Sequence, residues 1–556
     1  MFIRIKTTPN SPRQSVQIVE NYRNKAGAVR QRIVHYVGIA RDDDELEKLK
    51  NYGEELILKI KSERADPTLF DDLFSHSAGA GRPKTKRLED IASPSQVNLD
   101  DVVEEKRIIE GVHDIAGQLY NDLGFNRILP RGANGTLKDM VLMRFSNPTS
   151  KRESCRILDD QFGKDIFLDK VYRMMDQLEF QIPKIQNLIR CASLRLLKDK
   201  IDILLFDVTT LYFESVDVDE LRNFGYSKDQ KYYCTQIVLA LATTGDGLPI
   251  GYELFEGDFA EVKTLRKYLE SWKNQGLEIG GVCLAGDAAM FSKSNLSLMQ
   301  EMGISYVVAA PLRKLKKEIK DQILDVKKYQ TGVIGQDIVL LNEIPYLDNQ
   351  RIIVNYSAVR AKKNAYDRQC LLDKLSKKLG TKKNMKNLVS NRGYLKYFQE
   401  NGETVCQLNE EKVAQEEQWD GIRGIVTNAP KEEKALELLQ RYRRLWKIEE
   451  SFRINKHTLK MRPIYHFKER RIKAHIAICY MAFALMRHLE YRIKITQRKL
   501  SPNEILSALN SVQASILIHK KTRDRYRIPS PLKSEARIIY QAFGIKRSQD
   551  AQIYIT

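Results

Sequence analysis

The sequence lacks the cysteine and histidine patterns that hold a structural metal or a disulfide framework. Its seven cysteines are scattered and form no C-x-x-C pair, and its eight histidines form no H-x(3–5)-H or H-E-x-x-H pair. Structural zinc sites need such closely spaced ligands, and disulfide scaffolds concentrate cysteine in short chains. We therefore expect reduced thiols buried in the core, and no structural zinc.

Long apolar runs are also absent. The longest, AHIAICYMAFALM at residues 474–486, is flanked by Arg471, Lys473 and Arg487 and falls short of the about 20 residues that a membrane span requires. The amino-terminal MFIRIKTTPNSPRQS has no apolar core of signal-peptide length. The sequence thus predicts a buried helix at 474–486 and a cytoplasmic protein with no membrane partner.

Acidic residues are in the minority. The chain has 72 Asp and Glu against 92 Lys and Arg, a net charge of +20. An excess of this size favours a polyanionic partner, either nucleic acid or an anionic membrane surface. Residues 441–500 carry 17 Lys and Arg against 4 Glu and no Asp. A solvated helix face would carry a balance of signs, so this tract predicts salt-dependent binding to DNA phosphates.

The chain is too long for a single hydrophobic core and predicts three to four units of about 150 residues each. Changes in composition and in hydrophobic pattern divide the sequence into six regions. They are a small N-terminal α/β unit (1–65), a linker (66–105), a helical region (106–200), a core in two parts (201–311 and 420–495), a Lys-rich insertion with short strands (312–419) and a C-terminal helical unit (496–556). The helices of 106–200 fit a helix-turn-helix unit that binds DNA ends and a plain bundle about equally well.

Two short buried strands of the predicted core end on an aspartate. IDILLFD (201–207) ends on Asp207, and GGVCLAGD (280–287) ends on Asp287. The order of strands and helices around them predicts an α+β fold with a mixed sheet flanked by helices. Carboxylates at the ends of adjacent strands converge, and carboxylate oxygens are the ligands that Mg²⁺ prefers. Two such ions can activate an attacking oxygen and stabilise a leaving one on phosphorus.

The stretch YRRLWKIEESFRINK, residues 442–456, contains two adjacent glutamates. On one continuous helix at about 100° per residue, a single face carries Tyr442, Glu449, Arg453 and Lys456. Glu450 falls off that face, and Trp446 is expected in the core. A lone glutamate is usually a solvated surface residue, but the two strand-end aspartates make Glu449 a candidate third carboxylate.

The segments FDVTTLYFE, LAGDAAMFS and YRRLWKIEESFRINK together resemble the insertion-sequence DDE transposases of bacteria and archaea. One large group of that family carries Y-x(2)-R-x(3)-E-x(6)-K around its last carboxylate. Tyr442, Glu449 and Lys456 stand at this spacing, whereas the arginine position is Leu445. Either Arg443 or Arg444 takes over the phosphate contact, or this subgroup lacks it.

The resemblance implies an RNase H-like catalytic core with an insertion between its second and third carboxylates, a place that residues 312–419 fit. It implies that Asp207, Asp287 and Glu449 are the catalytic residues and bind two Mg²⁺ or Mn²⁺ ions. It also implies contacts with DNA, which we assign to Tyr442, Arg443, Arg444, Arg453, Lys456 and Trp419. For Trp419, stacking on a base competes with the more ordinary role of a hydrophobic anchor.

The predicted function is transposition. Water would attack the scissile phosphate at each end of the protein's own insertion sequence, and the 3′-hydroxyl so formed would attack target DNA. The resemblance implies double-stranded DNA as partner, a homodimer that synapses two ends, and a prokaryotic cytoplasm with nucleoid association. Alternatives are another RNase H-like nuclease, against which the IEESFRINK spacing argues, and a non-transposing DNA-binding derivative, against which the three intact carboxylates argue.

Overall fold

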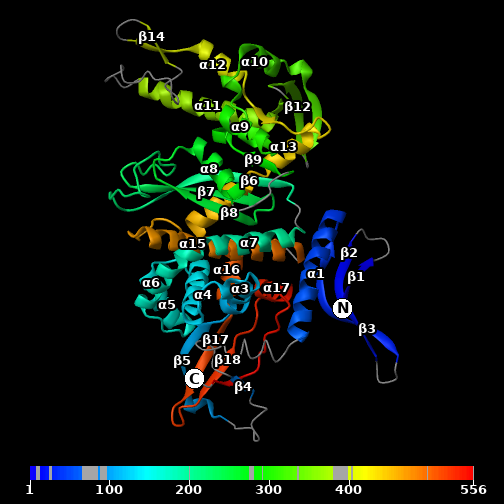
Figure 1. Cartoon of the computed structure of the whole chain (residues 1–556), viewed down its shortest axis with the longest axis vertical. Coiled ribbons are helices and arrows are strands. Elements are labelled where there is room, and N and C mark those ends of the chain that lie inside the picture. The colour runs from blue at the N-terminus through cyan, green and yellow to red at the C-terminus, as the bar shows by residue number, and fades with distance from the viewer. Residues whose placement is uncertain are drawn as a thin grey trace. The chain divides into compact units, whose positions relative to one another are not determined.

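The computed structural model describes residues 1–7, 13–23, 28–65, 85–87, 97–198, 201–274, 281–290, 292–334, 337–347, 349–379, 398–401, 405–496 and 499–554 (Figure 1). The chain divides into two compact units. Unit 1 comprises residues 1–202, 207–259 and 447–556, and unit 2 comprises residues 203–206 and 260–446.

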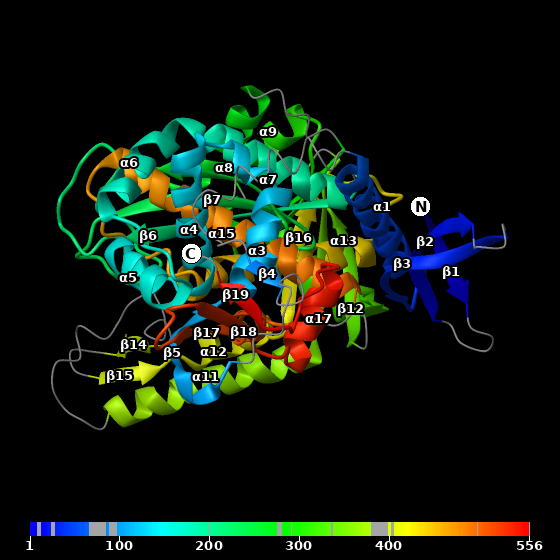
Figure 2. The same ribbon diagram turned by 90° about the horizontal axis from the view of Figure 1, so that it is seen from below.

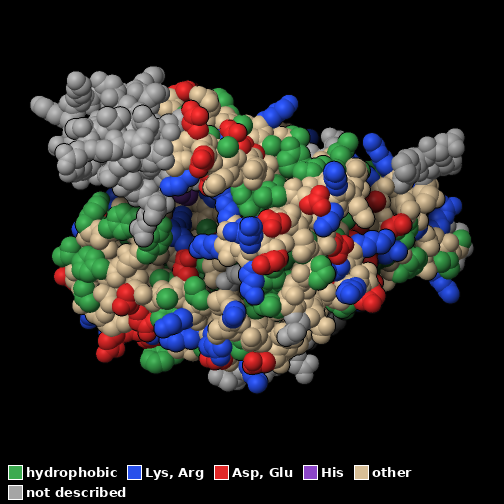
Figure 3. Space-filling model, turned by 90° about the horizontal axis from the view of Figure 1, so that it is seen from above, with side chains coloured by type: hydrophobic (Ala, Val, Ile, Leu, Met, Phe, Trp, Pro, Cys, Tyr) green, Lys and Arg blue, Asp and Glu red, His purple; other side chains and the backbone are tan. Residues whose placement is uncertain are grey.

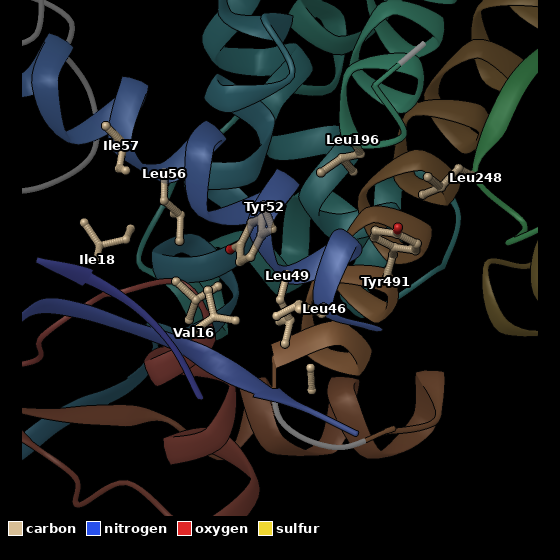
Figure 4. Packing of buried hydrophobic residues seen from close by; sticks show 12 residues of the cluster. Val16, Ile18, Leu46, Leu49, Tyr52, Leu56, Ile57, Leu196, Leu248 and Tyr491 are labelled. Atoms are coloured by element: carbon tan, nitrogen blue, oxygen red, sulfur yellow. The ribbon is translucent and has the colours of Figure 1, made fainter. Parts of the chain in front are cut away.

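The N-terminal part of unit 1 is a three-stranded antiparallel sheet covered by a helix. The strands are β1 (Phe2–Thr7), β2 (Gln14–Arg23) and β3 (Val29–Ala40), and the helix is α1 (Asp43–Ala65). Val16 and Ile18 of β2 pack against Leu49 and Tyr52 of α1 (Figure 4). Alternate residues of a strand point to one face, so this pair of valine and isoleucine faces the helix.

The helical region of unit 1 contains α3 (Gly111–Asp122), α4 (Arg131–Ser146), α5 (Lys151–Phe162), α6 (Leu168–Leu178) and α7 (Ile182–Leu196). These helices pack around α15 (Glu469–Thr496), whose residues are buried along most of its length. The buried helix expected at 474–486 is therefore present. Among the described residues, no helix has both the length and the apolar character needed to traverse a membrane.

A nine-stranded sheet forms the centre of the fold, in the order β11-β12-β13-β16-β10-β9-β6-β7-β8. The core strands are β6 (Ile203–Tyr212), β7 (Gln236–Thr244), β8 (Pro249–Phe255), β9 (Cys283–Gly286), β10 (Ser305–Ala309) and β16 (Ile422–Thr427). Strand β9 pairs in parallel with β6 and β10, whereas β7 pairs antiparallel with β8. The expected α+β class with a mixed sheet is confirmed, and the order β8-β7-β6-β9-β10 agrees with an RNase H-like core.

Three strands of the expected insertion join the central sheet. The strands β11 (Gln330–Ile334), β12 (Asp337–Pro345) and β13 (Arg351–Tyr356) extend the central sheet, because β13 pairs with β16 along its full length. The remainder includes α10 (Lys317–Leu324), α11 (Ala358–Leu379), α12 (Glu410–Glu417) and a hairpin of β14 (Phe398–Asn401) and β15 (Val405–Leu408). The short strands of this Lys-rich sequence did not reveal that they join the central sheet, since strand pairing depends on residues far apart in the chain.

The sequence suggested a helical C-terminal region. In the structure this region also contains strands. Between α16 (Pro502–Asn510) and the chain end, β17 (Gln513–His519), β18 (Arg525–Pro529) and β19 (Gln552–Tyr554) surround α17 (Ser534–Ala542). With β4 (Thr85–Arg87) and β5 (Val102–Ile109) they form a five-stranded sheet (Figure 2). Buried and partly exposed residues alternate along β17, which is the mark of a strand with one buried face. Most of the linker expected at 66–105 lies outside the described residues.

Candidate active site

The two aspartates follow a pair of parallel strands. Within unit 2, the first residues of β6 pair with β9, ending with Leu205 opposite Ala285. Two further residues along each strand lead to Asp207 and Asp287. The prediction that Asp207 ends its strand is wrong, because β6 continues to Tyr212. It continues by pairing on its other side, with β7.

Asp287 is held by the turn that follows β9. Its Oδ1 accepts a hydrogen bond from the Ala289 N–H at 2.8 Å, and its carbonyl accepts one from the Met290 N–H at 3.1 Å. The preceding Gly286 is required for this turn, since a Cβ there would lie 2.8 Å from Cγ of Met290. The backbone thus fixes the orientation of a half-buried carboxylate at the end of a buried strand.

Asp207 lies next to a cation that the sequence did not identify. Its Oδ1 accepts a hydrogen bond from the Val208 N–H at 2.7 Å, and Lys228 Nζ lies 4.0 Å from the same oxygen. Lys228 is anchored, because its Nζ donates to the Val208 carbonyl at 2.6 Å and its N–H donates to Thr210 Oγ1 at 3.2 Å. Lys228 stands 21 residues after Asp207 in the sequence, and only the folded chain brings the two together.

The stretch that carries both glutamates is not one continuous helix. Helix α13 (Ala435–Arg443) ends before a turn at residues 444–445, and α14 (Trp446–Arg453) begins after it. A π-helical turn, Ile454–Thr458, follows. Leu445, at the arginine position of the motif, is buried in the turn, and its N–H bonds to the Tyr442 carbonyl. The predicted single face joining Tyr442 to Lys456 is therefore wrong, because the helical phase is reset twice.

The two adjacent glutamates have different environments. Glu449 is exposed, between buried Ile448 and the buried pair Ser451 and Phe452. Glu450 is half-buried, and its Oε2 accepts hydrogen bonds from Lys447 Nζ at 2.8 Å and from Arg487 at 3.0 Å. Helical phase placed Glu450 off the face that carries Glu449, and of the two glutamates Glu450 is the more buried.

Neighbouring positive charges stabilise the carboxylate of the half-buried Glu450. Burial by itself would raise the pKa of Glu450, but the hydrogen bond from Lys447 and the charge of Arg487 outweigh it, so the pKa lies below its ordinary value. Arg487 is itself almost fully buried, and it also binds Glu490 at 3.0 Å and Ser451 Oγ at 2.8 Å. This network fastens α14 to α15 and leaves Glu449 on the accessible side.

Lys456 belongs to an ion-pair network with residues that the sequence did not single out. Its Nζ lies 3.4 Å from both carboxylate oxygens of Asp229, which also accepts from Arg462 at 2.6 Å. Burial lowers the pKa of Lys456, and the charge of Asp229 opposes that shift. A phosphate that binds Lys456 therefore competes with a carboxylate already in place.

The remaining predicted DNA contacts are spread over several elements. Tyr442 and Arg443 end α13, Arg444 is exposed in the turn, and Arg453 is exposed at the end of α14. Tyr442 and Arg443 belong to unit 2, whereas Arg453 belongs to unit 1.

Of the two tryptophans considered in the sequence, one differs from expectation. Trp446 is 48% exposed, so its assignment to the core is wrong. Trp419 is half-buried in the turn before β16, and the Arg313 guanidinium lies 6.0 Å from the ring centre while pairing with Glu416. One face of the Trp419 ring is therefore already occupied by a cation.

The basic tract 441–500 is largely neutralised by ion pairs within the protein. At least ten of its cations form ion pairs: Arg441, Lys447, Lys456, Arg462, Arg470, Arg471, Lys473, Arg487, Arg492 and Lys494. Their partners include acids far away in the sequence, such as Asp176 and Glu55. Acidic and basic side chains are likewise intermixed across the face in Figure 3. The tract therefore does not present a free cationic surface along its length.

The donor chemistry suits a hard divalent cation, although no ready-made cluster is present. Among the described residues, no group of three or more His, Cys, Asp or Glu side chains is arranged to hold a metal ion. Asp207 and Glu449 belong to unit 1, and Asp287 belongs to unit 2. Each of the three offers carboxylate oxygens, which are the ligands that Mg²⁺ and Mn²⁺ take in proteins.

Comparison with known proteins gives a consistent picture. A family model described as a transposase DDE domain matches residues 198–485, more than half of the chain. A second, described as the N-terminal domain of IS1634 family transposases, matches residues 3–67. No curated protein matches. Among solved structures, the chain is similar to the piggyBac transposase in a synaptic complex with hairpin DNA, at 9% identity and a TM-score of 0.36, covering 72% of this chain and 77% of that one.

Proposed function

The chain belongs to the DDE-domain transposases, and on that premise we propose that Asp207, Asp287 and Glu449 cut and join the ends of its own insertion sequence. The observation that carries this proposal is the parallel pairing of β6 with β9, in which each aspartate comes two residues after the last paired position. Glu449 is added because it is exposed next to Glu450, whose carboxylate the Arg487 network already holds.

Divalent ions supply the activation that the side chains lack. Two Mg²⁺ or Mn²⁺ ions, when bound, would lower the pKa of the attacking water or hydroxyl and neutralise charge on the phosphate. The three carboxylates would hold these ions. Water attacks the scissile phosphorus, the P–O3′ bond breaks, and a 3′-hydroxyl is left at the end of the element. That hydroxyl then attacks a phosphate of the target DNA and displaces its 3′-oxygen.

DNA binding is proposed for cations that remain accessible near these residues. Arg444 and Arg453 are exposed and suit phosphate contacts. Lys456 would bind a phosphate in exchange for part of its pairing with Asp229. Tyr442 and Arg443 keep the roles that the motif implies. For Trp419, the overlying Arg313 favours the anchoring role over base stacking.

The wider assembly follows from the family rather than from this chain alone. We propose that the helical region 106–200 contacts the terminal DNA, and that two copies synapse two ends in a prokaryotic cytoplasm. The double-stranded partners would be the inverted-repeat ends and the target.

Strand cleavage tests the proposed function. The full chain is incubated with a DNA fragment that carries the inverted repeats found beside its gene, with Mg²⁺, Mn²⁺, Ca²⁺ or EDTA. We expect a 3′-hydroxyl at the repeat ends with Mg²⁺ or Mn²⁺ and none with Ca²⁺ or EDTA. Asp207→Asn should bind the ends but leave them uncut, because DNA binding rests mainly on cations.

The alternatives predict other products. A DNA-binding derivative would bind the repeats and cut nothing under any condition. Another RNase H-like nuclease would cut DNA without the repeats equally well. Cleavage that persists in EDTA would exclude the proposed metal chemistry.

A further inference from the structure

Exposed aromatic side chains are concentrated on two short segments of unit 1. Residues 224–233 and 465–467 contain six large aromatic side chains that are exposed in the described structure: Phe224, Tyr226, Tyr232, Tyr233, Tyr465 and Phe467. Tyr226 is 77% exposed and Tyr233 65%. Aromatic rings are rarely left in water in such numbers unless the surface has a partner.

The two segments lie side by side. Phe213, at the end of β6, forms a parallel bridge with Ile464, and the Ile464 N–H bonds to the Tyr212 carbonyl. The Arg222 guanidinium lies 5.6 Å from the Phe213 ring centre and 5.8 Å from that of Phe467. One continuous surface therefore contains rings from both segments.

Cations are interleaved with these rings. Lys231 Nζ lies 5.6 Å from the Tyr212 ring centre and 5.4 Å from that of Tyr233, and it donates to the Tyr233 hydroxyl at 2.9 Å. The Arg462 guanidinium lies 5.4 Å from the Tyr212 ring centre. The Tyr226 and Tyr232 rings are 6.4 Å apart. Alternating rings and cations suit a ligand with flat apolar groups and negative charges.

The turn that carries most of these side chains is well ordered. Gln230 has φ of 59°, in the left-handed region, and its N–H bonds to the Ser227 carbonyl. Ser227 is buried and its Oγ accepts the Lys231 N–H at 3.1 Å. Little ordering would be needed on binding, which favours affinity.

The same turn leads to the candidate catalytic strand. Lys228 bonds to the Val208 carbonyl and lies 4.0 Å from Asp207, and Asp229 pairs with Lys456 and Arg462. Partial burial and the negative charge of Glu214 raise the pKa of Tyr465, and Glu214 lies next to this surface. A DNA strand with a phosphate near Asp207 would thus lie close to the rings and cations of this surface.

We propose that the aromatic loop surface, defined as Tyr212, Tyr226, Lys231, Tyr232, Tyr233 and Arg462, binds unpaired nucleotides of the DNA strand next to the scissile phosphate. Bases stack on the exposed tyrosines, Lys231 contacts the backbone, and Arg462 supports the Tyr212 ring. Stacking on aromatic side chains contributes about 1–3 kcal/mol per base and tolerates any base. The proposal rests on the proposed function and adds a strand-selective site to it.

The test compares a fully paired repeat end with the same end carrying four unpaired nucleotides, one of them 2-aminopurine. The full chain and its Tyr232→Ala/Tyr233→Ala variant are titrated, with fluorescence anisotropy for affinity and 2-aminopurine emission for stacking. We expect the wild type to prefer the unpaired end by about tenfold and to quench its emission, and the variant to lose both while binding the paired end as before. The control Tyr22→Ala, a side chain 41% exposed on β2 of unit 1, should behave as wild type.

A Tyr232→Phe/Tyr233→Phe variant should keep the preference, because stacking needs the ring and not the hydroxyl. Retention of the preference and quenching in the alanine variant would overturn the proposal. A wild type that binds both ends equally would also overturn the proposal, although the proposed function would stand.

A wild type that binds neither end would instead overturn the proposed function. A change from dimer to monomer in the alanine variant, with the preference intact, would assign the surface to a second copy of the chain and overturn the proposal.

Discussion

The basic tract 441–500 and the loop 222–233 use their charges in opposite ways. The tract has 17 Lys and Arg, but at least ten of them are engaged in ion pairs, several deep in the protein, as Arg487 and Arg492 are. The loop has three Lys and Arg, and it exposes tyrosines beside them. A count of charges along the sequence therefore overstates how many cations of the first region are available to a partner, and it overlooks the exposed rings beside the cations of the second.

The physical reason lies in helix α15. Most of its residues are buried, and a charge that is removed from water needs a partner of opposite sign. The arginines of α15 pair with acids from distant segments. Arg492, for example, pairs with Glu55. Such ion pairs stabilise the folded unit, and they leave few donor groups of these arginines available to bind DNA.

Removal of Arg487 should have the largest effect. Arg487→Met leaves Glu450 and Glu490 without their shared cation, and breaking a buried pair on one side costs about 3–5 kcal/mol. Urea unfolding followed by circular dichroism measures this loss. Lys494→Met is the control: its side chain is 54% exposed and lies 3.9 Å from Asp246, so a change within about 0.5 kcal/mol is expected. Equal losses in both variants would contradict a structural role confined to the buried cations of the tract.

The adjacent glutamates should separate activity from stability. Glu449→Gln is expected to lower strand cleavage by more than about a hundredfold, because a ligand to a metal ion contributes several kcal/mol to the transition state, while stability and end binding stay unchanged. Glu450→Gln should weaken the contact with Arg487 and lower the unfolding midpoint, but the folded variant should cleave. Cleavage assays and thermal unfolding on both variants decide the matter, and the reverse pattern would show that the catalytic carboxylate is Glu450.

Lys151 is a buried cation without the carboxylate partner that Arg487 has. Its Nζ lies 3.5 Å from His475 Nδ1, and burial lowers its pKa from the ordinary 10.5 to about 7. Between these values the unfolded chain binds a proton that the folded chain has released, so stability should rise with pH from about 7 toward 10.5. Lys151→Met should remove this slope and stabilise the protein at pH 6 by about 1–3 kcal/mol.

Urea unfolding at pH 6 and pH 9 measures the slope, with the exposed Lys170→Met as control. A wild type whose stability is flat over this range, or a Lys151→Met variant that is less stable than wild type at pH 6, would refute the assignment of an unpaired buried charge.

The smallest expected effect is a gain in DNA affinity. Asp229→Asn removes the carboxylate that Lys456 and Arg462 share. Both cations then become available to phosphate, and we expect binding of repeat ends to strengthen by about threefold to tenfold with a steeper salt dependence. Asp217→Asn, an exposed acid in a neighbouring loop, should leave the affinity unchanged. Weaker binding by Asp229→Asn would mean that Asp229 positions the two cations for DNA rather than competing with it.

Local patterns in the sequence predicted several parts of the fold correctly. The buried helix at 474–486, the mixed sheet and the strand that leads to Asp287 follow from apolar runs and their turn residues, because burial and backbone hydrogen bonding act on neighbouring residues. The transposase assignment came from three short motifs with fixed spacing, and the family model agrees with it. Such motifs can be recognised without the tertiary structure, because the residues of each stand close together in the sequence.

What depends on contacts between distant segments was decided by the tertiary structure alone. Helical phase separated Glu450 from Glu449, but it could not predict that Arg487, 37 residues away, would bind the Glu450 carboxylate while Glu449 stays exposed. The break at Leu445, the strands of the C-terminal sheet and the partners of the basic tract were likewise set by packing. A side chain's charge is written in the sequence, but its availability depends on which opposite charge the fold brings to it, and that partner can come from anywhere in the chain.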